Sequence, residues 1–417
     1  MATGIDRHVL GQRVAYWRVQ RHLTQHELAD RLGRPRNWIW KIESGSVGSL
    51  ERYSTLAQVA DALTVDMQVL LGQDLQRRPA ATECVDSETV EAIREALERY
   101  DALGGVLTAP RAAAGPPDLA HLHRQVDYLW AAWQRARYGI LGATLPKLLV
   151  DAQLAHTASD GNDRIEAASL LTQSYQLTAS VLRKLGEQQL GWLAADRAVR
   201  LVGETDDICW RGSAIYRVGN ALLSLGRVDA ALQVHLAGVD QLSPDAAADD
   251  NPDRMSVYGH CLLQAAITAA RKGDSASVAD LFTEAGAAAE HLGVDDDRYQ
   301  TTFGPTNVAV HRVAAAVEMG EGPRAVEHHE AISPDALAGL RPERRANHLL
   351  DVARGYAQWG KPDQAAEFLV AAAALCPAEV RCRPVAQSVL RELSRRRKVE
   401  NLPAPLRDLA VAAAMPE

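Results

Sequence analysis

Two short runs of hydrophobic residues at helical spacing lie near the beginning of the chain. Leu28 and Leu32 give the first run an apolar face, and Ile39 and Ile42 give one to the second. Gly33 stands between the runs, where a residue in the left-handed conformation commonly ends a helix. The pattern therefore predicts two short helices joined by a tight glycine turn, which is the arrangement of a helix-turn-helix.

The flanking residues extend this unit to five helices. Thr24 and Glu27 have the spacing of a capping box, so the first short helix is expected to begin after Thr24. Hydrophobic spacing predicts one helix before the motif, over residues 9–19, and another after it, over residues 50–63. Asp66 can cap a last short helix. We expect these five helices to form one small N-terminal domain.

The outer face of the second short helix suits duplex DNA. Ile39 and Ile42 must face the core of the domain. The residues left on or near the outer face are Arg36, Asn37, Trp40 and Lys41. Arginine and lysine can donate hydrogen bonds to guanine in the major groove, and asparagine can pair with adenine. The competing interpretation of this helical pair is a packing unit or a protein-binding module.

Charge favours the DNA-binding interpretation. Residues 7–41 contain eight Lys or Arg and two acidic residues, a net charge of +6, in a chain whose net charge is −8. Residues 1–75 together hold nine basic and eight acidic residues, which leaves about −9 on the remainder of the chain. Since DNA phosphates attract positive charge, only the N-terminal domain is expected to bind double-stranded DNA.

Residues 8–72 resemble the phage-repressor-like (XRE) helix-turn-helix family, including the string Ile-Glu-Ser-Gly that begins at Ile42. The resemblance implies sequence-specific DNA binding. It also implies that Gln25, second in its helix, contacts a phosphate or an adjacent base. General phosphate-binding candidates are Ser44, Ser46 and Arg52. Trp38 is expected to be half-buried beside Ile39 and Ile42.

The rest of the chain has the periodicity of a helical repeat array. Residues 73–87 lose hydrophobic spacing and predict a connector, and Ser87 can cap a helix that runs to about residue 103. After a second break at 108–117, helix and glycine turn alternate. The predicted turn glycines are Gly139, Gly186, Gly226, Gly273, Gly320 and Gly360, separated by 47, 40, 47, 47 and 40 residues. Such a period predicts an α-solenoid.

The predicted fold class is therefore all-α, with a repressor-like head of five helices followed by an α-solenoid body. The expected domains are a DNA-binding head over residues 1–75, a linker and connecting helix over 76–117, and an effector-binding and dimerisation domain over 118–417 with capping helices at its end. At 417 residues the chain is too long for one ordinary core. Aromatic residues make up only 5% of it, which also favours close-packed helices.

The last unit most clearly resembles a tetratricopeptide repeat. Its small and large residues fall at Val352, Ala353, Tyr356, Gly360, Ala365, Leu369, Ala372 and Pro377. In that family the first helix of each pair lines a concave groove. The resemblance implies that the inward positions are Trp130, Trp133, Arg137, Gln173, Gln176, Arg217, Asn220, His260, Gln264, Asn307, His311, Asp351 and Arg354.

These inward positions are rich in amides and other polar groups, which suits a peptide or a polar small-molecule effector. Arg217, Asn220 and Asn307 are the leading candidates, because they could clamp a ligand's backbone or carboxylate. Two alternatives stay open for any one of these residues. It can belong to a solvated wall of the groove, or it can form hydrogen bonds between helices.

Several other features limit the function. The five cysteines are scattered, which predicts reduced thiols rather than a disulfide framework. No apolar run is long enough for a membrane span and the start lacks a signal peptide, so we expect a soluble, cytoplasmic protein with no membrane contact.

The nucleotide-binding, hydrolase and zinc-protease motifs are absent, so no enzyme activity and no cofactor are predicted. His328 and His329 are adjacent and point apart, and Asp295, Asp296 and Asp297 lack calcium-loop spacing, so no metal site is expected.

As a whole, the chain resembles actinobacterial XRE-type regulators with tetratricopeptide bodies. The strings that carry this resemblance are Leu-Arg-Lys-Leu-Gly from Leu182, Leu-Ala-Ala-Asp-Arg-Ala from Leu193 and Phe-Gly-Pro-Thr-Asn-Val from Phe303. The chain is also similar to peptide-sensing quorum regulators. The resemblance implies ligand-controlled transcription by a DNA-binding protein, and a homodimer is expected because one head covers only one half-site. The alternative is a scaffold that binds a partner protein and uses the head for assembly or weak DNA attachment.

Overall fold

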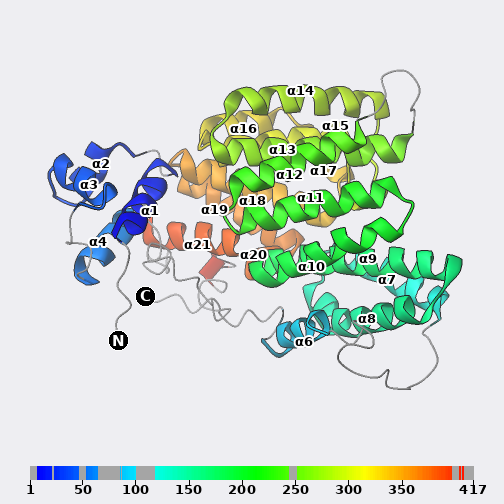
Figure 1. The fold of residues 1–417 in the computed structure, drawn as a ribbon. Helices are drawn as coiled ribbons and strands as arrows, with labels where there is room; N and C mark the ends of the chain where they lie inside the picture. Colours follow the sequence, from blue (N-terminus) through cyan, green and yellow to red (C-terminus); the bar gives the residue numbers. More distant parts are fainter. Residues whose placement is uncertain are drawn as a thin grey trace, which may run out of the picture. The chain divides into compact units, whose positions relative to one another are not determined.

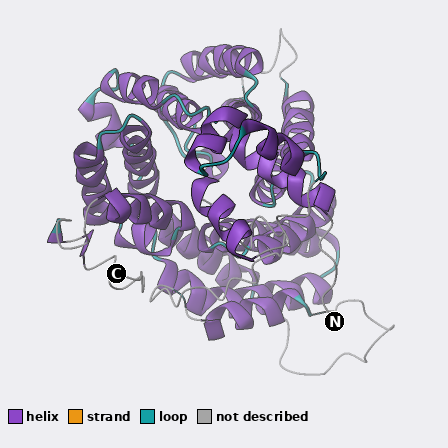
Figure 2. Ribbon diagram, turned by 90° about the vertical axis from the view of Figure 1, so that its left-hand side faces the viewer, coloured by secondary structure: helices purple, strands orange, loops and turns teal. Residues whose placement is uncertain are grey.

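The computed structural model describes residues 7–20, 23–46, 53–63, 85, 87–99, 118–243, 251–396, 403–404 and 406–407. Within these ranges the regular structure is helical, apart from an isolated bridge between Asp296 and Phe303. Figure 2 shows purple helices throughout the described chain. The chain divides into two compact units, Met1–Ala80 and Ala81–Glu417, here called the head and the body. The predicted all-α fold class is confirmed.

The head contains helices α1 (Arg7–Gln20), α2 (Gln25–Arg31), α3 (Arg36–Glu43) and α4 (Tyr53–Leu63). Its core includes Leu28, Ile39, Ile42 and Leu63, each at most 1% exposed. The predicted capping box is present, since the Thr24 hydroxyl accepts from the Glu27 amide at 3.2 Å and the Glu27 carboxylate accepts from the Thr24 amide at 2.7 Å. Gly33 has the expected left-handed conformation. The last predicted helix of the head, at 66–71, lies outside the described residues.

Helix α6 (Ser87–Leu97) belongs to the body. Ile93 and Leu97 on α6 are fully buried in the same hydrophobic cluster as residues of α8. The connecting helix predicted from the sequence therefore packs on the body as one of its elements. The end expected at about residue 103 differs from the observed end at Leu97, and residues 100–117 lie outside the described part.

Within the described residues, six antiparallel helical pairs follow. They are α7 (Leu119–Trp133) with α8 (Tyr138–Ala158), α9 (Gly161–Leu185) with α10 (Gln188–Leu201), α11 (Ile208–Ser224) with α12 (Val228–Leu242), α13 (Pro252–Lys272) with α14 (Ser275–Leu292), α15 (Pro305–Glu318) with α16 (Gly322–Glu330), and α18 (Pro342–Gln358) with α19 (Pro362–Leu375). The short helix α17 (Pro334–Gly339) precedes the last pair, and α20 (Pro377–Cys382) and α21 (Pro384–Arg396) follow it (Figure 1). Stacked pairs of this kind are the tetratricopeptide-like solenoid that the period predicted.

Five of the six predicted turn glycines have a left-handed conformation between the helices of a pair: Gly186, Gly226, Gly273, Gly320 and Gly360. Gly139 is the exception, and its assignment was wrong. The left-handed residue of the first turn is Ala136, with φ of 52°, and Gly139 lies inside α8. The physical reason is that the buried Tyr138 already begins α8, so the turn must be complete before it.

The body closes on itself. The hydrophobic cluster of α6–α11 also contains Ala346 from α18 and Cys382 from α20. The amide of Glu343, at the start of α18, donates to the carbonyl of Gln134 after α7 at 3.1 Å. The first and last pairs of the array therefore share a core, and the inward faces of the first helices line a central space.

Two chemical expectations can be compared with the body. Cys261 and Cys376 are buried free thiols. Cys382 is disulfide-bonded, so the expectation that all five cysteines are reduced was wrong for this residue, because scattered positions in the sequence do not reveal which thiols the fold brings together. Among the described helices, none combines the length and the apolar character that a membrane span needs.

Candidate functional site

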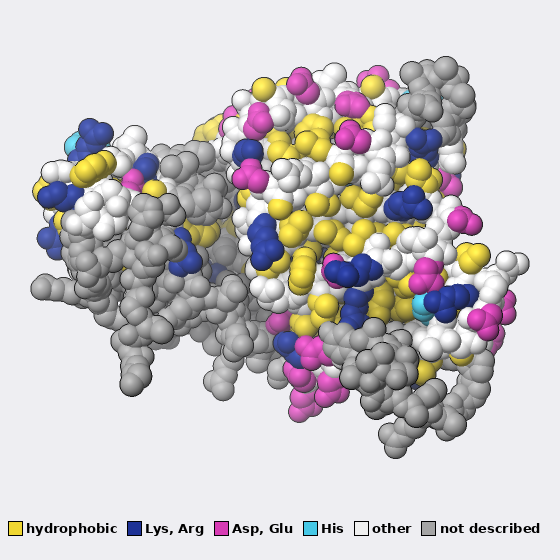
Figure 3. All heavy atoms as spheres, viewed as in Figure 1, with side chains coloured by type: hydrophobic (Ala, Val, Ile, Leu, Met, Phe, Trp, Pro, Cys, Tyr) yellow, Lys and Arg dark blue, Asp and Glu magenta, His cyan; other side chains and the backbone are white. Residues whose placement is uncertain are grey.

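The outer face of α3 is the exposed surface that the sequence predicted. Ile39 and Ile42 are 0% and 1% exposed and fix the helix to the core of the head. The four residues on the outside, Arg36, Asn37, Trp40 and Lys41, are all exposed, and Trp40 is 54% exposed. In Figure 3, the head shows more dark-blue Lys and Arg side chains than magenta acidic ones. This helix therefore presents two cations, an amide and an aromatic ring to solvent.

Glu43 anchors the C-terminal end of α3. Its carboxylate forms a bidentate ion pair with Arg18 of α1, at 2.6 and 3.1 Å. It also accepts from the side-chain amide of Gln25 at 2.8 Å. Gln25 thus links α2 to α3 in this structure, in place of projecting freely outward. The three contacts hold α3 in a fixed orientation within the head.

The remaining predicted residues of the head lie around the ends of α3. Ser44 donates to the carbonyl of Lys41, and the hydroxyls of Ser44 and Ser46 are 2.8 Å apart. Arg52 lies outside the described residues. Trp38 is half-buried against the core, as expected, and the guanidinium of Arg34 lies 5.4 Å from the centre of its ring.

The body contains a cavity of about 290 Å³, here called the body cavity. Its wall comes mainly from the first helices of the pairs, together with Arg383, which follows α20, and Val385 of α21. Of the residues predicted to face inward, those that line it are Trp133, Arg217, Asn220, His260, Gln264, His311, Asp351 and Arg354. The structure therefore brings together residues from five helices that are widely separated in sequence.

Five predicted residues do not line the cavity. Trp130 is 2% exposed and packs against the guanidinium of Arg217, whose carbon lies 5.3 Å from the ring centre. Gln176 is buried and joins α9 to α11 through Trp210 and Ser213. This is the inter-helix bonding that the sequence left open as an alternative.

The other three lie elsewhere in the body. Arg137 is exposed in the first turn, and Gln173 is half-buried on α9. Asn307 is fully buried, and its amide donates to the carbonyl of Thr301 at 3.4 Å. Asp295 accepts from the backbone amides of Thr306 and Asn307, so this aspartate caps α15.

Sequence reasoning missed several charged residues of the cavity: Arg183, Lys184, Arg271, Glu318, Glu343, Arg344 and Arg383. Lys184, Arg271 and Glu318 lie near the ends of their helices, one to two turns beyond the last inward position considered. Continuing the three- and four-residue spacing along each first helix would have identified them. Among the described residues, the cavity lining has seven Lys or Arg and three Asp or Glu.

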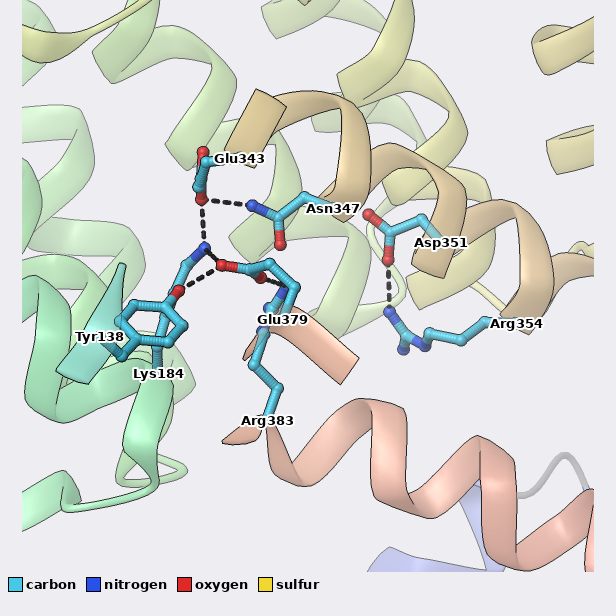
Figure 4. Close-up of polar contacts among 8 residues, drawn as sticks. All are labelled: Tyr138, Lys184, Glu343, Asn347, Asp351, Arg354, Glu379 and Arg383. Carbon is cyan, nitrogen blue, oxygen red and sulfur yellow. Dashed lines mark hydrogen bonds and ion pairs between the residues drawn. The ribbon is translucent and has the colours of Figure 1, made fainter. Parts of the chain in front are cut away.

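One buried ion-pair cluster joins the two ends of the body (Figure 4). The ammonium of Lys184 on α9 donates to Glu343 on α18 and, at 2.6 Å, to Glu379 on α20. Glu379 also accepts from the hydroxyl of Tyr138 and, at 3.2 Å, from Arg383. Although burial alone would raise the pKa of Glu343, Lys184 and Arg344 lower it to about 2. Two cations and two carboxylates balance one another in this cluster.

A second cluster lies on the wall formed by α13, α15 and α18. Glu318 accepts from Arg271 at 2.7 Å and from Arg354 at 2.9 Å, and Arg354 also donates to Asp351 at 2.9 Å. Burial would raise the pKa of Glu318, but the two guanidiniums lower it to about 2. This cluster too contains two cations and two carboxylates.

The chain was compared with protein families, curated proteins and solved structures. Residues 9–71 match the family described as "Helix-turn-helix domain". A search of curated proteins returned no significant match. Among solved structures, PlcR of Bacillus thuringiensis, in complex with the peptide PapR7 and DNA, is similar at 17% identity, covering 69% of this chain and 96% of its own, with a TM-score of 0.31.

Two further solved structures are distantly similar. Aspartyl phosphate phosphatase F of Bacillus subtilis has 8% identity over 90% of this chain and 96% of its own, with a TM-score of 0.43. A Rap protein complexed with competence and sporulation factor has 11% identity over 90% of this chain and 99% of its own, with a TM-score of 0.38. The family match identifies a helix-turn-helix domain in the head, and the helical pairs of the body, later in the sequence, are tetratricopeptide-like.

Proposed function

We propose that this protein is a sequence-specific DNA-binding transcriptional regulator whose DNA affinity is controlled by a ligand held in the body cavity. The observation that carries the proposal is the outer face of α3. Its exposed Arg36, Asn37 and Lys41 side chains have the hydrogen-bonding groups that contact base edges in the major groove. Ile39, Ile42 and Glu43 fix the orientation of that face.

DNA binding is assigned to the head alone. The positive charge of residues 7–41 attracts phosphates, whereas the chain beyond residue 75 carries about −9 and repels them. Because one helix-turn-helix covers a single half-site, we propose that two copies of the chain bind DNA together as a homodimer. Two half-sites then supply the specificity that one lacks.

The body cavity supports the ligand-binding part of the proposal. First helices from both ends of the array line it, and its wall includes Asn220, Gln264 and Arg217 together with the aromatic side chain of Trp133. A ligand in the body cavity contacts α11, α13 and α18 at the same time. It can therefore bind more tightly to one arrangement of these helices than to another. A ligand alters DNA affinity only through such a difference in affinity between two conformations.

Selection from a random library of duplex DNA tests the DNA-binding part. With the full chain as bait, we expect enrichment of a sequence with two half-sites whose centres lie about 10 base pairs apart. Binding to the selected fragment should weaken steeply between 50 and 200 mM salt, as phosphate contacts require. Failure to enrich any sequence, together with capture of a protein partner, would favour the scaffold function.

The ligand-binding part needs its own measurement. The small-molecule fraction of a culture extract should change the affinity of the full chain for the selected DNA. Asn220→Ala and Gln264→Ala should reduce this response while leaving DNA affinity without extract unchanged. An equal response in both variants and the parent protein would remove the body cavity from the mechanism.

A further inference from the structure

The charges around the body cavity are unbalanced. The two ion-pair clusters account for Lys184, Arg383, Arg271 and Arg354, each in contact with a carboxylate. Three other guanidiniums line the same cavity: those of Arg183, Arg217 and Arg344. Within the described chain, none of these three has a carboxylate within ion-pair distance. When Glu379 of the first cluster is counted with the described residues of the cavity wall, a surplus of three positive charges is left.

Arg217 is the most buried of the three, at 6% exposed. Its guanidinium donates only to neutral groups, namely the side chain and carbonyl of Ser213 and, at 3.3 Å, the hydroxyl of Ser180. The carbon of its guanidinium lies over the ring of Tyr216, 4.5 Å from the ring centre. These contacts hold the guanidinium in place without neutralising it, and burial lowers its pKa.

Arg344 and His260 each have an unused donor at this wall. The Nε of Arg344 is buried and has no hydrogen-bond partner among the described residues, and the same holds for Nδ1 of His260, a side chain 3% exposed. The side-chain NH₂ of Gln264 lies 3.3 Å from Nε2 of His260. Because an amide NH₂ can only donate, Nε2 accepts and the ring proton is on Nδ1. A buried donor without an acceptor is costly, and so is a buried charge without a counter-ion.

We infer that the body cavity binds a small organic anion with at least two negative charges, carboxylate or phosphate, whose acidic groups pair with Arg217, Arg344 and Arg183. The inference rests on the proposed function, since it names the chemical class of the controlling ligand. Such an anion offsets at least two of the three surplus charges and provides acceptors for the unused donors. The volume of about 290 Å³ lies near the lower limit of small-molecule sites, roughly 300–1,000 Å³, and suits a compact metabolite better than an extended peptide.

Isothermal titration of the full chain with citrate and with pyrophosphate tests the inference. Sodium chloride at matched ionic strength and a neutral capped tripeptide serve as controls for screening and for peptide binding. We expect saturable binding of one probe anion and none of the tripeptide. The anion that binds more tightly distinguishes a carboxylate ligand from a phosphate ligand.

Substitutions locate the binding. Arg344→Met and Arg183→Met should each weaken binding of the preferred anion at least tenfold, whereas Arg200→Met, at a side chain 77% exposed on α10, should leave it unchanged. Without ligand, Arg183→Met should unfold at the same temperature as the parent protein or higher, because Arg183 has no ion-pair partner among the described residues and both burial and Arg383 disfavour its charge. A purely structural arginine would give a lower temperature.

Three results would overturn the inference: no saturable binding of either anion, binding of the tripeptide alone, or equal anion binding in Arg344→Met, Arg183→Met and the parent protein. DNA plays no part in this experiment. If the chain binds an anion but selects no DNA sequence, the inference therefore stands and the proposed function is contradicted. If the chain binds DNA selectively but binds neither anion, the inference is contradicted and the DNA-binding part of the proposed function stands.

Discussion

Four buried histidines in the body are held in the neutral form. Burial lowers the pKa of His235 to about 4 and the pKa values of His311 and His348 to about 3, and it lowers the pKa of His260 well below 6.5. For His260 and His311 the nearby guanidinium of Arg344 adds to the effect of burial. Each of these side chains therefore resists protonation in the folded protein at a pH where the unfolded chain accepts a proton.

This difference makes stability depend on pH. An unfolded histidine takes up its proton near pH 6.5, whereas His235 stays neutral in the fold down to about pH 4. The free energy of unfolding should therefore be constant above pH 6.5 and fall as the pH decreases towards 4, by up to about 1.4 kcal/mol per pH unit for this histidine. Urea titrations at pH 7, 6 and 5 measure it. In His235→Gln the decrease in the free energy of unfolding between pH 7 and pH 5 should be smaller by the contribution of this histidine. An unchanged pH dependence would contradict the lowered pKa of His235.

At the scale of elements, close contacts between neighbouring helices require glycine at particular positions. A Cβ atom at Gly259 on α13 would lie 2.0 Å from the ring of Phe303, which is fully buried. At Gly286 on α14, a Cβ would have no neighbour within 4 Å. Close packing therefore requires the absence of a side chain at Gly259, whereas no steric contact requires it at Gly286.

Alanine at each position should show the difference. Gly259→Ala should lower the free energy of unfolding by about 1–3 kcal/mol, since the ring of Phe303 must move in a packed core. Gly286→Ala should raise it by up to about 1 kcal/mol, because alanine favours a helix over the unfolded chain. Denaturant titrations of both variants measure this, and losses of equal size would contradict the packing assigned to Gly259.

The elements were largely predictable from the sequence, because a helical pair is set by local signals. The capping box at Thr24 and five of the turn glycines are examples, and each depends on only a few neighbouring residues. Gly139 was misassigned because its position in the period did not reveal that Tyr138 already begins a helix. The inward positions were predictable in part. Gln176 and Asn307 stand at positions that face inward in the repeat family. In this structure they form hydrogen bonds to other elements, and the sequence alone does not give the distance between those elements.

The ion-pair clusters depend on the closed body and could not be predicted locally. Lys184 and Glu379 are 195 residues apart in sequence. Their contact requires the whole array to curve through a full circuit, which is set by small rotations at every pair. The surplus of positive charge at the body cavity became visible only after these partners were known.

Breaking the first cluster should destabilise the whole body. Lys184→Met would leave the buried carboxylates of Glu343 and Glu379 without their shared cation, at an expected cost of about 3–5 kcal/mol in the free energy of unfolding. Lys147→Met is the matched control, because Lys147 pairs with Asp151 while 72% exposed and should cost less than about 1 kcal/mol. Thermal unfolding compares the two, and similar small losses would show that the cluster does not hold the body closed.

For the whole molecule, the central claim is that an acidic body controls a basic head that alone binds DNA. Equilibrium binding of the full chain to its selected DNA fragment tests this most directly, with Arg36→Ala and Asn37→Ala, singly and combined. Each substitution should cost about 1–3 kcal/mol if the side chain contacts bases, and Arg200→Ala in the body should cost nothing. A combined variant that binds the fragment as tightly as the parent protein would contradict the assignment of α3 as the recognition helix, and with it the proposed function.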